Sequence, residues 1–266
     1  MTDSTTGRSG KTEIIKRAAV GLFWLAVWQL AAVLVGEPLF LPSPVSVART
    51  FVSLLGQAAF YAAVGNSFCR ITAGFLLAAL AGLLLAAAAA RFDAVKTLLS
   101  PLMGAVKATP VASFIILALI IATSARLSTL IAFLMALPVV YGNTLAGIEA
   151  IPPTMFYPAD VFGMTRGTRL RYIYFPEVFP YFRAACSTAL GLSWKAGVAA
   201  EVIGIAAGTV GEKLYEAKIY LNIPELFSYT LTIVLLSLLL EKLLSAALRA
   251  LFNAVLGYTR ENSPLQ

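Results

Sequence analysis

The chain has 266 residues, of which 59% are apolar and only 12% charged, and its formal net charge is +7. Soluble globular domains carry about 25% charged residues, so this composition excludes an ordinary soluble domain and indicates a protein that faces lipid. The absence of histidine excludes a Ser-His-Asp triad, a histidine metal site and a histidine proton relay. Cys69 and Cys186 lie in or beside apolar runs, which favours buried free thiols over a metal cage or a disulfide framework.

Six apolar runs are candidates to cross a bilayer, which takes about 20 helical residues. The first four are free of charged residues, and the first of them is expected to be an anchor rather than a cleavable signal peptide. The fifth contains Lys195 and Glu201, and the sixth reaches Glu241 and Lys242. The expected spans are Ala18–Val35, Ile71–Ala90, Ala108–Ala125, Leu127–Ile148, Ala184–Ala207 and a sixth that begins near Leu226.

The distribution of Lys and Arg predicts that both termini lie in the cytoplasm. On this assignment residues 1–17 form a basic cytoplasmic tail, 18–250 a transmembrane domain, and 251–266 a second cytoplasmic tail. Alternate assignment of the six spans places thirteen basic residues on the inner side: Arg8, Lys11, Lys16, Arg17, Arg91, Lys96, Arg166, Arg169, Arg171, Arg183, Lys242, Arg249 and Arg260.

The basic tail contains a sequence that resembles the end of a phosphate-binding loop, Gly7-Arg-Ser-Gly-Lys-Thr12. The first glycine of that motif is replaced by Thr5, no apolar strand precedes it, and a membrane helix follows. A flexible basic tail beside lipid headgroups is therefore the preferred interpretation.

Two outer connections also carry local patterns. Leu41-Pro-Ser-Pro44 predicts a turn, and residues 46–55 after it predict a short amphipathic helix. In the outer loop 208–225, Glu212 and Glu216 are interpreted as solvated charges on one helical face.

The inner connection 149–183 is far longer than a link between two spans requires, and it is rich in aromatic residues and arginines. Permease subunits of binding-protein-dependent ABC importers carry in such a loop Glu-Ala-Ala, then Gly, then Ile-x-Leu-Pro at set distances. This chain keeps Ala159, Gly163, Ile173 and Pro176 at that spacing. It departs where Tyr157-Pro158 stands for Glu-Ala, and where Phe175 stands for Leu.

Further residues extend the similarity over nearly the whole chain. Leu41–Pro44, Arg70 with Gly74-Phe75, and Trp194 with Ala199-Ala-Glu201 resemble the nitrate, sulfonate and taurine class of these permeases. The resemblance implies that the inner loop forms a coupling helix that docks in a groove of a separate ATPase. The alternative is a loop that packs only against its own helix ends. The coupling residues implied in this way are Met155, Phe156, Tyr157, Ala159, Asp160, Phe162, Gly163, Arg166, Ile173 and Pro176.

Charges at membrane depth are costly and indicate function or a specific partner. Ser187, Gly191, Lys195 and Ala199, each four residues apart, form a ridge of mostly small residues on which another helix can approach closely. One hypothesis places Lys195 in a translocation path, where it attracts an anionic solute, with Trp194 and Glu201 along the same helix. The other pairs these charges with a neighbouring helix or a symmetry mate.

The expected fold is therefore an all-α membrane protein with about six transmembrane helices, the MetI-like fold of type I ABC importer permeases. The resemblance implies a multi-pass subunit of the bacterial inner membrane, with ABC ATPase subunits, an extracytoplasmic solute-binding protein and a second permease copy as partners. We expect membrane lipid but no nucleic acid as a further partner, and no cofactor or metal on this chain, because ATP and Mg²⁺ would bind the ATPase. An intramembrane enzyme and a secondary transporter are the alternatives, and the solute stays open.

Overall fold

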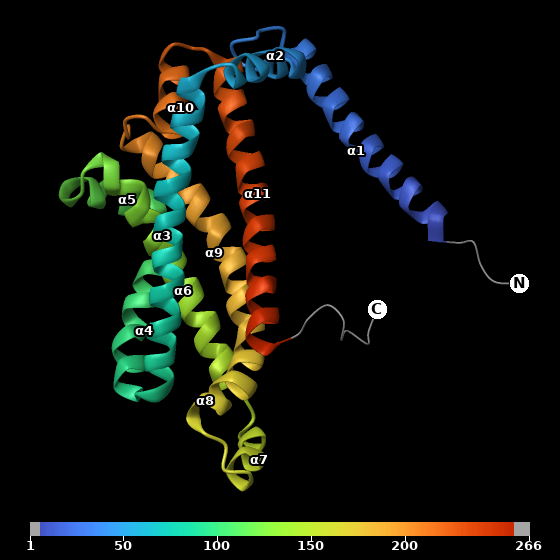
Figure 1. The fold of residues 1–266 in the computed structure, drawn as a ribbon. Helices are drawn as coiled ribbons and strands as arrows, with labels where there is room; N and C mark the ends of the chain where they lie inside the picture. The colour runs from blue at the N-terminus through green and yellow to red at the C-terminus, as the bar shows by residue number, and fades with distance from the viewer. Residues whose placement is uncertain (1–5, 258–266) are drawn as a thin grey trace, which may run out of the picture. The chain divides into compact units, whose positions relative to one another are not determined.

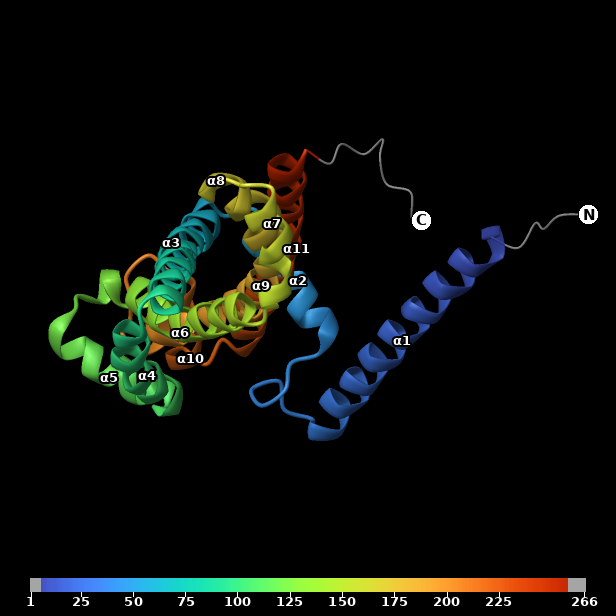
Figure 2. The same cartoon turned by 90° about the horizontal axis from the view of Figure 1, so that it is seen from below.

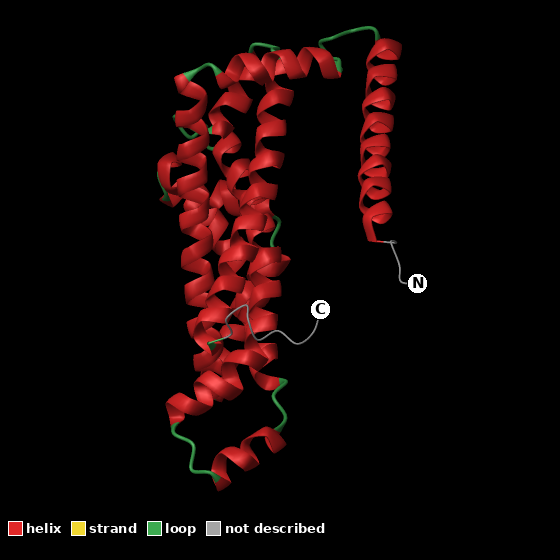
Figure 3. Ribbon diagram, turned by 45° about the vertical axis from the view of Figure 1, so that its right-hand side comes forward, coloured by secondary structure: helices red, strands yellow, loops and turns green. Residues whose placement is uncertain are grey.

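The computed structural model describes residues 6–257, and this part of the chain is built from helices and their connections, with no strand in it (Figure 1; Figure 3). The side chains of Arg8, Lys11 and Arg17, and Arg260 with the end of the C-terminal tail, lie outside the described residues. The chain divides into two compact units. One unit holds the N-terminal part to Tyr61 with Lys213–Thr232, and the other holds Ala62–Glu212 with the part from Ile233 onward.

The first unit contains α1 (Thr6–Val35) and α2 (Pro44–Leu55), together with the first turns of α3 (Ala58–Arg91) and α11 (Ile223–Leu256) and most of α10 (Val210–Ile219). The Pro-Ser-Pro turn starts α2 as expected, because Ser43 Oγ accepts a hydrogen bond of 3.2 Å from the amide of Ser46. The predicted amphipathic helix is thus confirmed. It buries Val47 and Leu54.

The second unit is a bundle formed by α3, α6 (Ser124–Glu149), α9 (Phe175–Ile203) and the later part of α11, seen end-on in Figure 2. Helices α6 and α9 run antiparallel along most of their length, and Ser193 Oγ donates a hydrogen bond of 2.9 Å to the carbonyl of Ala132. Glycines allow close approach at two of the helix contacts. A Cβ on Gly147 of α6 would lie 2.8 Å from Tyr181 of α9, and one on Gly197 of α9 would lie 2.7 Å from Ile71 of α3.

Four helices are long and apolar enough to cross a membrane: Ala18–Val35 within α1, and α3, α6 and α11. The bent pair α4 (Asp93–Ala108) and α5 (Val111–Ile121) is a fifth candidate among the described residues. Helix α9 has 29 residues, which span about 44 Å at 1.5 Å per residue, but it carries Lys195 and Glu201. The chain is thus an all-helical, multi-span protein.

The expected straight span over 108–125 is wrong. The two helices α4 and α5 meet there at an angle of 107°. The break lies at Thr109 and Pro110, because a residue before proline avoids the helical region and Thr109 has φ −79° and ψ 129°. The helix expected over Ala184–Ala207 corresponds to α9, which begins earlier than expected, at Phe175. The last part of the expected inner loop is therefore helical.

Candidate functional site

The connection between α6 and α9 is folded into short helices (Figure 1). It contains a 3₁₀ turn at Pro153–Met155, α7 (Phe156–Val161), α8 (Arg166–Arg169) and a π-helical turn at Leu170–Tyr174 that leads into α9. Gly163 ends α7 with φ +57°, a left-handed conformation that glycine adopts without steric cost.

Arg169 stabilises this connection from within. Its guanidinium lies 2.8 Å from the carboxylate of Asp160. The same side chain donates hydrogen bonds to the carbonyls of Met164, at 3.1 Å, and Ala159, at 3.3 Å. Ala159 is almost completely buried. The sequence reasoning named Arg166, which is exposed, and missed the role of Arg169, because Asp160 and Arg169 lie in two different short helices that only the fold brings together.

The outer side of α7 is apolar and exposed. Val161 is 81% exposed, Phe162 78% and Tyr157 64%, and Met155 just before the helix is also exposed. Phe156 is different, because its ring lies 5.5 Å from that of Tyr174 and packs on the connection itself. We call Tyr157, Val161 and Phe162 the α7 face. Val161 was missed from the sequence because an isolated valine carries no motif.

The remaining residues of the family motif lie at the base of the connection. Ile173 is half-buried in the π-helical turn, and Pro176 occupies the first turn of α9, where proline costs no helical hydrogen bond. These two residues are therefore placed to set how the connection enters α9, apart from the exposed α7 face.

A buried polar network lies at the other end of α9. The carboxylate of Glu201, which is fully buried, accepts hydrogen bonds from Ser67 Oγ at 2.6 Å and from the amide of Gly211 at 3.4 Å. Ser67 Oγ also accepts a hydrogen bond of 2.9 Å from the amide of Val210. Glu201 and Ser67 thus satisfy two amides at the start of α10, which would otherwise have no helical partner. We call these four residues the Glu201 network.

Five buried side-chain polar atoms in the same unit have no hydrogen-bond partner within the described residues. Three of them are Arg70 Nη1 on α3, Ser128 Oγ on α6 and Glu201 Oε1 on α9, and the other two are the hydroxyl oxygens of Thr72 and Thr144. Buried polar atoms are nearly always paired, so such atoms mark positions that water, a solute or a shifted helix can satisfy. Sequence reasoning named Glu201 but not Ser67, Arg70 or Ser128 as its surroundings.

Trp194 and Lys195 are neighbours on α9 but differ in their exposure. Trp194 is buried, and its indole nitrogen donates a hydrogen bond of 3.0 Å to the carbonyl of Ile233 on α11. Lys195 is exposed and makes no ion pair or hydrogen bond in the part of the chain that the structure describes. The structure therefore groups Trp194 and Glu201 on buried faces and separates both from Lys195.

The fold defines a membrane permease that spans the bilayer several times and has an exposed, folded connection between α6 and α9. Residues 74–256 match the family described as binding-protein-dependent transport system inner membrane component, and the chain belongs to this family. It is thus a multi-pass inner-membrane permease component of ABC transport, not an enzyme, and ATP hydrolysis belongs to a partner subunit. Membership sets aside the intramembrane enzyme and the secondary transporter.

Individual relatives agree with this assignment. The nitrate import permease protein NrtB of Synechococcus elongatus is 27% identical over 73% of this chain and 73% of its own length. The taurine transport system permease protein TauC of Escherichia coli is 25% identical over 84% of this chain and 83% of its own length. The crystal structure of an amino acid ABC transporter matches with a TM-score of 0.57 at 17% identity, covering 77% of this chain and 98% of the solved chain, which supports the fold.

Proposed function

We propose that two copies of this chain form the translocation path for a small anionic solute, and that the α7 face couples the path to ABC ATPase subunits. The observation that carries the coupling role is the exposed apolar α7 face, held in shape by Arg169 and Asp160. Apolar and aromatic anchors on a short helix are typical of docking into a groove on a partner protein. An extracytoplasmic binding protein would deliver the solute, and both termini would lie in the cytoplasm.

The proposed solute class rests on charge and on the relatives. The named relatives import nitrate and taurine, which both carry an anionic group. Lys195 supplies a cation at membrane depth that has no anionic partner in the described part of one subunit. A cation there attracts an anionic solute, and Trp194 and Glu201 on the buried faces of α9 hold the helix that presents it.

The coupling role is tested by Val161→Asp, with Val52→Asp on α2 as a matched control at an exposed valine. A tagged permease is purified from its native membrane in mild detergent, and the ATPase that accompanies it is quantified. We expect Val161→Asp to reduce ATPase recovery by at least about tenfold, because a charge on a desolvated anchor costs about 2 kcal/mol or more. Equal recovery with both variants would contradict the coupling role.

The role of Lys195 is tested by transport of nitrate and taurine into vesicles that hold the assembled complex. We expect Lys195→Met to raise KM or lower turnover, and Lys195→Arg to restore most of the activity, because the positive charge is what matters. Unchanged transport by Lys195→Met would show that Lys195 does not act in the translocation path. Loss of the permease dimer in the same variant would favour the alternative, a structural pair with the symmetry mate.

A further inference from the structure

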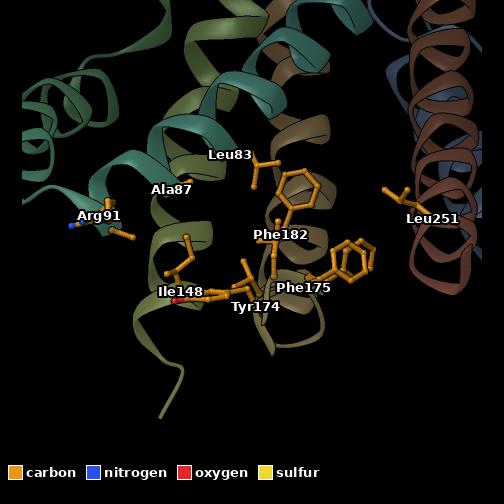
Figure 4. A pocket seen from close by; sticks show the side chains of 12 residues that line it. Leu83, Ala87, Arg91, Ile148, Tyr174, Phe175, Phe182 and Leu251 are labelled. Carbon is orange, nitrogen blue, oxygen red and sulfur yellow. The ribbon is translucent and has the colours of Figure 1, made fainter. Parts of the chain in front are cut away.

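A cavity of about 520 Å³ lies within the second unit, between the end of α3, the end of α6, the start of α9 and α11 (Figure 4). Its wall is formed by aromatic and aliphatic side chains. Phe175 and Phe182 stand near its middle, Leu83 borders it on α3, and Leu251 borders it from α11 (Figure 4). The volume is in the range of sites that hold a small molecule or a chain of comparable size, about 300–1,000 Å³.

The wall is unsuited to a small hydrated anion. Among the lining residues only Arg91 is charged, and Tyr174 is the only other one with a polar side-chain atom. A path for nitrate or a sulfonate must replace the water of the ion with hydrogen-bond donors, which hydrocarbon and phenyl surfaces cannot do. The cavity therefore calls for a largely apolar occupant.

One cation lies at the edge of this apolar wall. Arg91 is the last residue of α3, a helix of 34 residues that crosses the membrane, so it lies where the hydrocarbon core gives way to headgroups. Its guanidinium carbon lies 5.4 Å from the centroid of the Phe92 ring. Arg91 forms no ion pair with any carboxylate in residues 6–257. Its charge is therefore free to meet an anionic group.

A second cation lies close to the same wall. A neighbouring cavity of about 420 Å³ shares Leu170 and Phe175 with the first and is also lined by Arg171. The Nε of Arg171 donates a hydrogen bond of 2.7 Å to the carbonyl of Val255, which leaves its terminal nitrogens for other acceptors. No acidic residue lines either cavity.

We propose that this cavity binds one acyl chain of an anionic phospholipid, with the phosphate of the headgroup at Arg91 and Arg171 nearby. The apolar wall between the spanning helices matches the acyl chain of such a lipid, and the arginines at the edge of the wall match its anionic headgroup. Basic pockets between transmembrane helices on the cytoplasmic side are a recurrent way to hold anionic headgroups. The site is separate from the α7 face and from Lys195, so it stands even if the proposed solute class is wrong.

The test measures lipid binding to the purified full-length permease by native mass spectrometry, with phosphatidylglycerol and phosphatidylcholine of identical acyl chains as probes. We expect phosphatidylglycerol to bind about fivefold more tightly, the factor that corresponds to about 1 kcal/mol for one headgroup contact. Arg91→Gln should abolish this preference while Arg91→Lys keeps it. Arg249→Gln, at a cation on α11 outside both cavities, should leave it unchanged.

A second variant tests the cavity itself. Ala87→Phe places a ring in the cavity and should reduce binding of both lipids severalfold, whereas Ala73→Phe, at an exposed position of the same helix outside the cavity, should not. Equal binding of the two lipids by the native protein, or an unchanged preference in Arg91→Gln, would overturn the proposal. Loss of the permease dimer in Ala87→Phe, without an effect on lipid, would assign the cavity to a second copy of the chain and would also overturn it.

Discussion

The close contact between Gly211 and Glu201 makes Gly211→Ala the sharpest test of the Glu201 network. A Cβ on Gly211 would lie 2.2 Å from the Cβ of Glu201, 2.6 Å from its carbonyl carbon and 2.7 Å from the amide nitrogen of Val202. Two of these three atoms belong to the backbone, which cannot move aside by rotating a side chain. The start of α10 must therefore move away from α9.

The size of the effect follows from two losses. Overpacking of a well-packed interior costs about 1–3 kcal/mol. The same displacement lengthens the bond of 3.4 Å from the amide of Gly211 to the Glu201 carboxylate, and a hydrogen bond to a charged group contributes about 1.5–3 kcal/mol. We therefore expect a destabilisation of about 3–5 kcal/mol. For a chain of this size that lowers Tm by at least about 6 °C.

Thermal unfolding of the purified protein in one detergent, followed by circular dichroism, measures this change. Gly65→Ala is the matched control, because a Cβ there meets no atom within 4 Å and the residue lies inside α3. The control should leave Tm unchanged or raise it slightly, since alanine favours helix over glycine by about 1 kcal/mol. If Gly211→Ala unfolds within 1–2 °C of the control, about the shift from half a kcal/mol, the described contact of Gly211 with Glu201 and Val202 is incorrect.

Three further substitutions test other contacts. Arg169→Ala removes the ion pair with Asp160 and two bonds to backbone carbonyls, so limited digestion with chymotrypsin, which cleaves after aromatic residues, should cut the α6–α9 connection about tenfold faster. Gly163→Ala puts a side chain at φ +57°, at a cost of about 1 kcal/mol, and should speed amide exchange in α7 without changing the Tm of the bundle. Trp194→Phe loses the bond to the carbonyl of Ile233 and should lower Tm by about 2–4 °C, whereas an unchanged Tm would show that this bond contributes nothing.

The spanning helices could be predicted because their signal is local. Continuous apolar runs predicted the spans in α1, α3, α6 and α11, and a proline turn predicted the start of α2. Both the spans and the start of α2 depend on hydrogen bonds within one short segment of the chain. The bend between α4 and α5 was missed although Pro110 is visible in the sequence. Hydropathy averages over a window and does not respond to one residue that breaks the helix.

The candidate site could be predicted only in part, because its contacts join distant residues. The motif spacing located the α6–α9 connection. Which side chains this connection exposes depends on tertiary packing, and the spacing of motif residues does not determine that packing. The ring of Phe156 packs on that of Tyr174, whereas Val161, which the sequence did not single out, is the most exposed member of the α7 face. Likewise Glu201 is noticeable in the sequence because it is an acidic residue in an apolar run. Ser67 lies 134 positions away and has no such signal, and only the fold places its Oγ 2.6 Å from the Glu201 carboxylate.

The two faces of α9 that carry glycines differ in what covers them, which bears on the proposed dimer. In lipid there is no hydrophobic drive between helices, so association depends on close backbone approach and on pairing of polar groups. On the buried face Gly197 already meets Ile71, and that contact is used within the subunit. On the open face a Cβ on Gly191 would meet nothing within 4 Å, and Lys195 one turn further on is exposed. An exposed cation is costly against hydrocarbon, and small residues there leave close helix packing unused. In the proposed dimer a second helix would pack on the small residues, and the anionic solute would pair with Lys195.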